Sequence, residues 1–297
     1  MITFLSGGTG TPKLLAGFRE IHEEFSVIVN TAEDVWVSGN RICPDIDSVI
    51  YALAGIIDEE RWWGVRGDTF KTHFRLKSLG FDEGMMIGDL DRATHIFRSE
   101  MLRKGMSLSK ATEMLCRAFG IKQKVIPMTE SEVATKVITD KGEMHFQEFW
   151  VKRKGEPEVI DVKIQGVEDA KASDGAVRAV ENSSAIVIGP SNPVTSIGPI
   201  IKLSEIRKVL KEKRVVAISP FIGDEPVSGP AGKFMKALGY PPNPEGLAEY
   251  YRGIADVLVV HYGDGFESDE CSVVEADIII RSRKDAVRLS KTILELL

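Results

Sequence analysis

The stretch Ile2-Thr3-Phe4-Leu5-Ser6-Gly7-Gly8-Thr9-Gly10-Thr11-Pro12-Lys13-Leu14 decides the fold. It begins with an apolar, β-prone run and continues with glycines and hydroxyls that are typical of a tight turn. Apolar residues then recur at Leu14, Phe18 and Ile21 with helical spacing. Thr11 suits the N-cap of that helix, and Pro12 suits its first position. The stretch therefore predicts a strand, a glycine turn and a helix, in that order.

The glycine turn is a candidate phosphate site. Glycines allow backbone N–H groups to converge without obstruction from a Cβ atom, and the dipole of the following helix adds partial positive charge. The three glycines and three hydroxyls found here exceed what a plain turn between a strand and a helix needs, although such a turn without a ligand is the alternative. The residues expected to hold the phosphate are Gly7, Gly8, Thr9, Gly10 and Thr11.

Two common nucleotide motifs are incomplete in this turn. Gly8 and Gly10 begin the G-x-G-x-x-G pattern of dinucleotide-binding proteins, but Lys13 occupies the position of the third glycine. The Gly-Lys-Ser/Thr ending of a P-loop is also missing. The sequence therefore favours neither an ordinary NAD-binding protein nor a P-loop NTPase.

The composition is that of a soluble globular protein. With 297 residues, of which 43% are hydrophobic and 28% charged, the chain is long enough for one large domain or two smaller ones. We expect a single elaborated domain over residues 1–297. Its formal net charge of −6 argues against a general nucleic-acid binder. No apolar stretch is long enough to span a bilayer, and no secretory signal precedes the first strand. Cys43, Cys116 and Cys271 show neither zinc spacing nor a disulfide framework. We expect a cytoplasmic protein without a membrane or nucleic-acid partner.

The order of the elements predicts a parallel sheet. Phe25–Asn30 reads as a buried strand, so a strand, a helix and a strand follow one another as in a right-handed βαβ unit. Ligands of such sheets bind beyond the carboxyl ends of the strands, where Asn30, Thr31, Glu33 and Asp34 fall. Asp34 follows the glycine turn at a distance suited to binding a ribose, but a plain loop acid is an equally good interpretation.

The rest of the chain continues this pattern with one interruption. Between residues 134 and 167, β-rich runs are separated by turn formers, which predicts a small antiparallel insertion. Later apolar runs predict further buried strands, which are Ala185–Ile188, Arg214–Ile218, Val257–Val260 and Ile278–Ile280. The expected fold class is α/β, with a mostly parallel sheet flanked by helices and the β-rich insertion at 134–167.

Two pairs of aspartates lie at expected helix starts. Asp45 suits the N-cap of one helix, and Asp47 follows in its first turn. Two carboxylates so close repel each other unless a cation or a proton intervenes. Mg²⁺ bound by one or two carboxylates and by substrate phosphates would resolve that repulsion. Asp89 is a second expected N-cap, again next to another acid, Asp91.

A second polar loop, residues 189–196, follows the predicted strand Ala185–Ile188. It is expected to face the glycine turn across the sheet as a second ligand loop, with Ser191, Asn192 and Thr195 as its candidate binding residues. Glycine, proline, serine and asparagine are also the usual turn formers, so an ordinary turn is an equally good interpretation.

Other chemically notable residues are interpreted as structural. His73 and His95 have no partners at metal spacing. Met85 and Met86, just before the helix expected at Asp89, are more often core-filling residues than ligand contacts.

Six segments of the chain together resemble the 2-phospho-L-lactate transferase family. They are Ser6–Leu14, Val29–Asp34, Pro44–Asp47, Trp63–Thr69, Gly88–His95 and Gly189–Pro193. The segments keep their order and run over most of the chain, so the match is far more specific than any single loop.

This resemblance implies a fold, a reaction and a set of partners. The fold would have a Rossmann-like core, the protein would be a homodimer, and the reaction would require Mg²⁺. The donor would be lactyl-2-diphospho-5'-guanosine, or a phosphoenolpyruvate-type relative of it. The acceptor would be the terminal ribityl hydroxyl of the deazaflavin Fo. Transfer of the phospholactyl group would release GMP in the biosynthesis of coenzyme F-420.

The resemblance also implies roles for individual residues. Asp47 and Met86 would lie by the deazaflavin, although related sequences often carry a basic residue at the position of Met86. Asp45 and Asp47 are the expected catalytic residues, and Asp45 and Asp89 are the expected metal ligands. The glycine turn would hold phosphate oxygens of the donor. The residues expected to bind its guanosine nucleotide are Ser191, Asn192 and Thr195.

Two alternatives belong to other functional classes. One is a nucleotide-sugar-sensing regulatory protein without catalysis, as in a related family of gluconeogenesis-control proteins that shares the Gly-Gly-Thr-Gly opening. The paired aspartates and the aromatic loop at Trp62 and Trp63 count against it. The other is a dinucleotide-dependent oxidoreductase, which the missing third glycine weakens.

Overall fold

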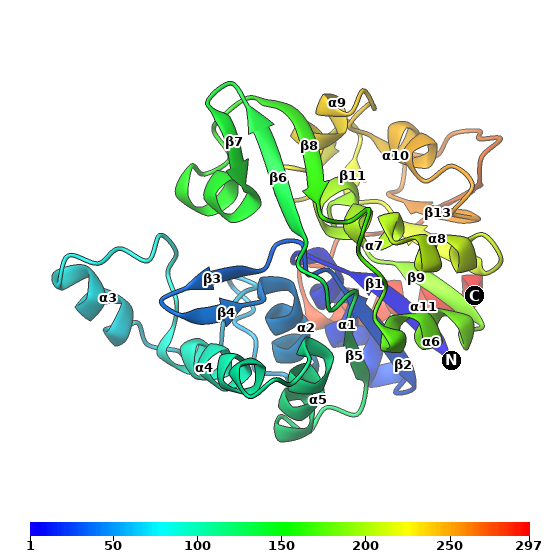
Figure 1. Ribbon diagram of the computed structural model, residues 1–297. Coiled ribbons are helices and arrows are strands. Elements are labelled where there is room, and N and C mark those ends of the chain that lie inside the picture. Colours follow the sequence, from blue (N-terminus) through cyan, green and yellow to red (C-terminus); the bar gives the residue numbers. More distant parts are fainter.

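A seven-stranded parallel sheet forms the centre of the computed structural model, which describes residues 1–297 (Figure 1). Its strands are β1 (Ile2–Ser6), β2 (Phe25–Val29), β5 (Lys124–Pro127), β9 (Ala185–Ile188), β10 (Arg214–Ile218), β13 (Val257–Val260) and β14 (Ser272–Glu275). Their order in the sheet is β14-β13-β10-β9-β1-β2-β5, and every neighbouring pair is parallel. The central strands are buried on both faces, so their sequences are continuous apolar runs.

Helices cover both faces of the sheet. Successive strand residues point to opposite faces, and Phe4 and Leu5 of β1 accordingly belong to two different apolar core clusters. The helices that pack into the cluster of Phe4 are α1 (Gly10–Ile21), α2 (Pro44–Ala54), α5 (Leu108–Ala118) and α11 (Arg283–Leu296). The helices that pack into the cluster of Leu5 are α6 (Asp174–Glu181), α7 (Gly198–Lys202), α8 (Ser204–Leu210), α9 (Ala231–Ala237) and α10 (Pro244–Tyr250). The predicted α/β fold class is therefore confirmed.

The predicted insertion is a separate antiparallel sheet of three strands. It is formed by β6 (Ala134–Thr139), β7 (Gly142–His145) and β8 (Val159–Gln165), in the order β7-β6-β8. A π-helical turn, η1 (Glu148–Lys152), connects β7 to β8. The inner residues of β6 and β8 belong to the same core cluster as Leu5, so the insertion packs on the parallel sheet without a break in the core.

The remaining elements lie at the carboxyl edge of the sheet or outside it. They are the hairpin β3 (Val35–Val37) and β4 (Asn40–Ile42), the helices α3 (Lys71–Ser78) and α4 (Asp89–Arg103), the π-helical turn η2 (Pro193–Ile197) and the hairpin β11 (Phe221–Ile222) and β12 (Glu225–Pro226). Helix α3 projects from the body of the molecule, at the left of Figure 1. No helix combines the length and the apolar character that crossing a bilayer requires.

The direction of the chain reverses across the sheet at β1. From β1 the chain proceeds to β2 on one side, and it later returns to β9 on the other side. Ligands of open parallel sheets bind at such a switch point, beyond the carboxyl ends of the strands. The glycine turn after β1 and the polar loop after β9 therefore lie next to each other, and the expectation that they face each other across the sheet was wrong.

One predicted strand is absent. Residues 278–280 pair with no strand, and the last strand of the sheet is β14 (Ser272–Glu275), which pairs with β13. Ile278 and Ile280 instead line the cavity described below. An apolar run of three residues does not distinguish a strand from a segment that covers a cavity, because both environments favour apolar side chains.

Three predicted N-caps were wrong. The residues before the first turns of α1, α2 and α4 are Thr9, Cys43 and Gly88, and none of them caps its helix with a side chain. Thr11, Asp45 and Asp89 lie inside these helices and bind partners elsewhere. Asp89 accepts hydrogen bonds from the backbone N–H groups of Lys71 and Thr72 at the start of α3, each at 3.0 Å.

Candidate active site

A cavity of about 580 Å³ opens at the carboxyl edge of the parallel sheet, beside the switch point. Its volume lies in the range of small-molecule sites, roughly 300–1,000 Å³. It brings together predicted site residues from four separate segments of the chain, which are Gly8, Thr9, Gly10, Asp45, Asp47, Met86, Ser191, Asn192 and Thr195. Gly7, Thr11 and Asp89 do not line it. Met86 is 39% exposed in the cavity, so the interpretation of this residue as core filling was wrong.

The glycines of the turn allow two loops to pack closely. A Cβ atom on Gly10 would lie 1.9 Å from the carbonyl oxygen of Pro190, and one on Gly7 would lie 2.6 Å from Cβ of Ser196. Gly8 has a φ of +56°, a conformation that favours glycine, and its N–H donates to Oδ1 of Asp45 at 2.8 Å. This N–H is therefore already bound within the protein. The N–H of Thr9 has no acceptor in the chain and lies at the cavity wall.

Ser191 joins the two loops. Its buried Oγ accepts from the N–H of Thr11 at 3.1 Å, lies 2.7 Å from Oγ1 of Thr11 and donates to the carbonyl oxygen of Gly7. The neighbouring Asn192 caps η2, because its Oδ1 accepts from the N–H groups of Val194 and Thr195. Nδ2 of Asn192 and Oγ1 of Thr195 are buried without a partner. Polar atoms that remain free for a ligand are therefore on Asn192 and Thr195.

Three buried carboxyl groups gather beside the glycine turn. Burial raises the pKa of Asp45 to about 6 and that of Asp34 to about 7. Burial and the nearby Asp45 carboxylate raise the pKa of Glu33 as well. Oδ2 of Asp45 accepts from Nδ2 of Asn30 at 2.9 Å, but Oε1 of Glu33 and Oδ1 of Asp34 have no hydrogen-bond partner. Oδ2 of Asp34 pairs with the guanidinium of Arg41 at 3.4 Å, whereas no ion pair involves Glu33 or Asp45. Within this cluster, Glu33 and Asp45 are therefore the acids without a cationic partner.

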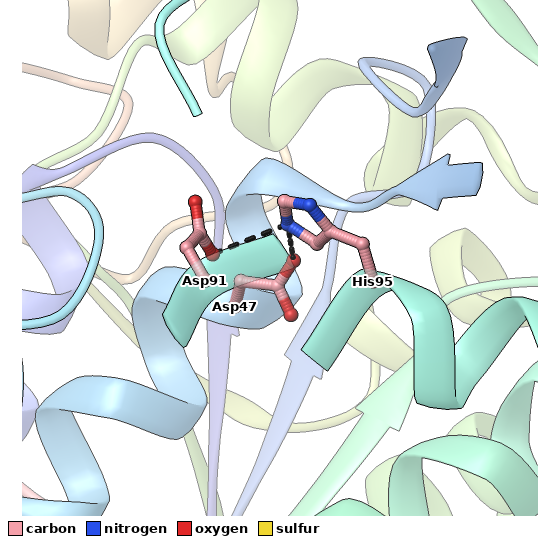
Figure 2. A group of neighbouring side chains, drawn as sticks. All are labelled: Asp47, Asp91 and His95. Atoms are coloured by element: carbon pink, nitrogen blue, oxygen red, sulfur yellow. Dashed lines mark ion pairs between the residues drawn. The ribbon is translucent and has the colours of Figure 1, made fainter. Parts of the chain in front are cut away.

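Asp47 lies on α2, two residues after Asp45, but its environment is different. The guanidinium of the fully buried Arg98 donates to both of its carboxylate oxygens, one of them at 3.0 Å. Nε2 of His95 lies 3.3 Å from Oδ2 of Asp47 and 3.2 Å from Oδ1 of Asp91. Figure 2 shows the histidine ring paired with both carboxylates. Tyr51 donates to the same oxygen of Asp91 at 2.8 Å. Residues of α2 and α4 therefore form one continuous buried ionic network.

The network fixes the charges of its members. Although burial alone would raise the pKa of Asp47, the Arg98 guanidinium and the His95 ring hold it below its ordinary value. Although burial opposes charge on the His95 ring, its hydrogen bonds to Asp47 and Asp91 raise the pKa of His95 to about 9. Asp47, Asp91 and His95 lie close enough together to bind a metal ion. Their two negative charges are already balanced by Arg98 and His95, so this group needs no added cation.

Several residues of the site were missed or misread in the sequence. The expectation that His95 has no partners at metal spacing was wrong, because its ring lies beside the carboxylates of Asp47 and Asp91 at such a spacing. Arg98 was missed, and the available signal was the spacing of Asp91, His95 and Arg98 on one face of a helix. His73 lies outside the cavity, near Glu83, with 3.5 Å between Nδ1 and Oε2.

The structure does not bring Asp89 to Asp45. Besides its bonds to Lys71 and Thr72, the carboxylate of Asp89 accepts from the hydroxyl of Thr69. These donors hold the pKa of Asp89 below its ordinary value. The carboxylate of Asp68 in turn accepts from the N–H groups of Leu90 and Asp91 at the start of α4. Asp68, which precedes α3, thus caps the start of α4, and Asp89, in the first turn of α4, caps the start of α3.

Comparison with known proteins identifies close relatives over the whole length of the chain. The family model described as 2-phospho-L-lactate transferase CofD matches residues 2–292. Proteins named 2-phospho-L-lactate transferase are similar in Methanococcoides burtonii, with 50% identity over 100% of this chain and 99% of that protein. The protein from Methanopyrus kandleri is 50% identical over 99% of this chain and 97% of its own length. The protein from Methanosarcina mazei is 49% identical over 99% of this chain and 99% of its own length.

The fold is also found in solved structures. Two crystal structures of one protein from Bacillus halodurans superpose with a TM-score of 0.67 each and cover 99% of this chain and 98% of their own. Their sequence identities to this chain are 17% and 16%. At this identity the similarity extends to the fold and not to the function.

Proposed function

The chain belongs to the 2-phospho-L-lactate transferase family of coenzyme F-420 biosynthesis, and within that family we propose the full reaction of this protein. The donor is lactyl-2-diphospho-5'-guanosine, and its phospholactyl group moves to the terminal ribityl hydroxyl of the deazaflavin Fo, with GMP as the leaving group. The observation that carries the proposal is the single cavity that joins the glycine turn, the loop of Asn192, the carboxylate of Asp47 and Met86.

The reaction needs alignment and charge neutralisation more than a protein nucleophile. The hydroxyl oxygen of Fo attacks the phosphorus that carries the lactyl group, and the bond from this phosphorus to the GMP oxygen breaks. The proton of the hydroxyl group leaves as the new phosphorus–oxygen bond forms. A carboxylate positioned beside the hydroxyl performs this task in other phosphoryl-transfer enzymes.

Asp47 is the residue suited to that task. Arg98 and His95 keep its carboxylate ionised and fixed in place. It is almost completely buried but lines the cavity, so one hydroxyl group can approach it. We assign to Asp47 the orientation of the ribityl hydroxyl and the acceptance of its proton.

The diphosphate of the donor fits the other side of the cavity. Groups available there are the N–H of Thr9 near the N-terminus of α1, the ammonium of Lys13, Nδ2 of Asn192 and Oγ1 of Thr195. Helix N-termini and cations favour phosphate groups. Gly7, Gly8, Thr11 and Ser191 support this site through the packing of the two loops.

A divalent cation fits the acidic cluster. Glu33 and Asp45 are buried, their pKa values are raised, and one oxygen of Glu33 has no partner. Oxygen donors of this kind suit Mg²⁺, which usually keeps several waters and shares its ligands with substrate phosphates. We propose Glu33 and Asp45 as the residues that hold Mg²⁺, which supplies positive charge to the diphosphate when bound.

The proposed homodimer has a candidate surface on α3 and α4. Large apolar side chains are exposed there, with Phe74 60% and Leu79 66% accessible, together with Leu90 and Ile96. Clusters of exposed apolar residues commonly mark protein interfaces. We propose that the exposed apolar side chains of Phe74 on α3 and Leu79 directly after it contact a second copy of the chain.

A reconstituted reaction tests the proposed function. Purified protein is incubated with Fo, the guanylated lactate donor and Mg²⁺, and the products are identified by mass spectrometry. We expect a phosphodiester-linked deazaflavin and GMP in equal amounts. Unmodified Fo with both the lactate and the enolpyruvate donor would refute the transferase reaction, and GMP without the deazaflavin product would indicate a hydrolase.

A further inference from the structure

The β-rich insertion contributes one wall of the cavity through the turn η1. Phe149 in this turn is fully buried and packs on Phe234 of α9, with ring centroids 5.5 Å apart. Its neighbours Trp150 and Val151 line the cavity instead. Phe149 therefore anchors the turn in the core while the next residue presents a large aromatic side chain to the cavity.

The indole of Trp150 is held in a defined position. A Cβ atom on Gly155 would lie 2.9 Å from Cζ3 of Trp150, so the ring rests against the backbone of Gly155. Gly155 has a φ of +65°, and its carbonyl oxygen accepts a hydrogen bond from the ammonium of Lys233. This hydrogen bond ties the segment between η1 and β8 to α9. Even so, Trp150 is 41% exposed. The ring is thus supported by the protein and still accessible from the cavity.

The turn η1 touches the segment that carries Met86. A Cβ atom on Gly84 would lie 2.0 Å from Cε of Lys152, so the side chain of the last residue of η1 lies against the backbone two residues before Met86. Met86 and Trp150 line the same cavity, and both are large apolar side chains left substantially exposed. Exposed apolar groups that line one cavity indicate a binding surface for an apolar part of a ligand.

We propose that Trp150 forms the second wall of the acceptor subsite, so that the tricyclic ring of the deazaflavin lies between Trp150 and Met86. This inference rests on the proposed function and deepens it. Extended planar rings stack on indole, and thioethers make favourable contacts with aromatic rings. The ribityl chain then extends from the ring toward Asp47, and the diphosphate of the donor occupies the side of Thr9 and Lys13.

With Trp150 in this position, the β-rich insertion is the element of the fold that selects the acceptor. Trp150 and Met86 lie on segments that contact each other through Lys152 and Gly84, whereas the free polar atoms of Asn192 and Thr195 lie on the loop after β9. Loss of the indole is therefore expected to weaken binding of Fo and to leave binding of GDP unchanged.

The test compares Trp150→Ala and Trp150→Phe with the matched control Trp36→Ala, since Trp36 is 48% exposed and lies outside the cavity lining. The Kd of Fo is measured through its fluorescence and the Kd of GDP by calorimetry, followed by KM and kcat for transfer.

We expect Trp150→Ala to raise the Kd and KM of Fo about tenfold or more, as for loss of one stacked ring. The kcat at saturating Fo and the Kd of GDP should stay within about threefold, well inside one tenfold step. Trp150→Phe should largely retain Fo binding, and Trp36→Ala should resemble the wild type.

Two results would overturn the inference while the proposed function stands. One is an unchanged Kd for Fo in a folded Trp150→Ala variant. The other is an equal increase in the Kd of Fo and of GDP, which would place the indole beside both ligands or at the nucleotide. A wild-type protein that binds no Fo would refute the proposed function itself, and the assignment of Trp150 with it.

Discussion

The guanidinium of Arg98 binds both carboxylate oxygens of Asp47 inside the protein. Arg98 comes from α4 and Asp47 from the first turn of α2, so the pair joins the two helices beside the cavity. Such a bidentate pair fixes the orientation of the carboxylate as well as its charge. In this protein it separates the roles of Asp47 and Asp45, which the sequence presents as one acidic pair.

Removal of Arg98 is expected to destabilise the fold strongly. Arg98→Met leaves the Asp47 carboxylate buried without its main partner, and loss of one member of a buried ion pair costs about 3–5 kcal/mol. Urea denaturation measures the difference. The control Arg103→Met, on the same helix, breaks an exposed pair with Glu100 and should cost less than about 1 kcal/mol. Equal losses for the two variants would contradict the structural role of Arg98.

The stability of the protein should decline between about pH 6.5 and 9 because of His95. Its pKa is raised to about 9 in the folded protein by Asp47 and Asp91, so its charge stabilises the fold fully below the ordinary histidine pKa. This contribution, about 3 kcal/mol, is lost as the pH rises toward 9. The free energy of unfolding, measured by urea denaturation at several pH values, should depend less on pH in His95→Gln than in the wild type. His22→Gln, which lies outside the network, should keep the pH dependence of the wild type. Equal pH dependence in the wild type and in His95→Gln would exclude the network as its cause.

Metal binding should depend on Glu33 and Asp45. We expect Mg²⁺ to raise the melting temperature of the wild type, because an ion that binds only the folded state stabilises it. Glu33→Gln and Asp45→Asn should remove this response, and the same variants should fail to bind Mn²⁺ in electron paramagnetic resonance. Asp89→Asn serves as the matched control and should respond like the wild type. If Asp89→Asn alone abolished binding, the metal would lie at the start of α3.

The apolar surface on α3 should determine the oligomeric state. A charge introduced at a buried subunit contact is strongly unfavourable, so Phe74→Asp and Leu79→Asp are expected to convert a dimer into a monomer in sedimentation velocity runs. Ile160→Asp, at an apolar position on β8 that is 57% exposed, provides the control. A wild-type monomer, or a dimer that survives both the Phe74 and the Leu79 substitution, would argue against this contact.

Much of the fold could be predicted from the sequence because parallel strands are buried on both faces. Ala185–Ile188 and Arg214–Ile218 were predicted with their observed bounds, since a continuous apolar run between turn formers is typical of such strands. The same reasoning wrongly predicted a strand at Ile278–Ile280, because a residue that covers a cavity is apolar for a different physical reason. Composition alone does not separate these environments.

The site could be predicted in part. Its loops were found because ligands bind where parallel strands end, and Asp47, Met86 and Asn192 indeed line one cavity. The partners of Asp47 could not be found, because Arg98 lies 51 residues away and meets it only through the packing of two helices. The different surroundings of Asp45 and Asp47 follow from helix geometry, since side chains two residues apart point in opposite directions, about 200° around the axis.

A crystal structure with Fo and GDP tests the central claim most directly, which is that one cavity at the switch point holds both substrates. The account predicts that the deazaflavin ring lies between Met86 and Trp150, that the terminal ribityl hydroxyl approaches Asp47, and that the phosphates of GDP contact Thr9 and the loop of Asn192. A structure in which either ligand binds outside this cavity, or in which the ribityl hydroxyl points away from the phosphates, would contradict it.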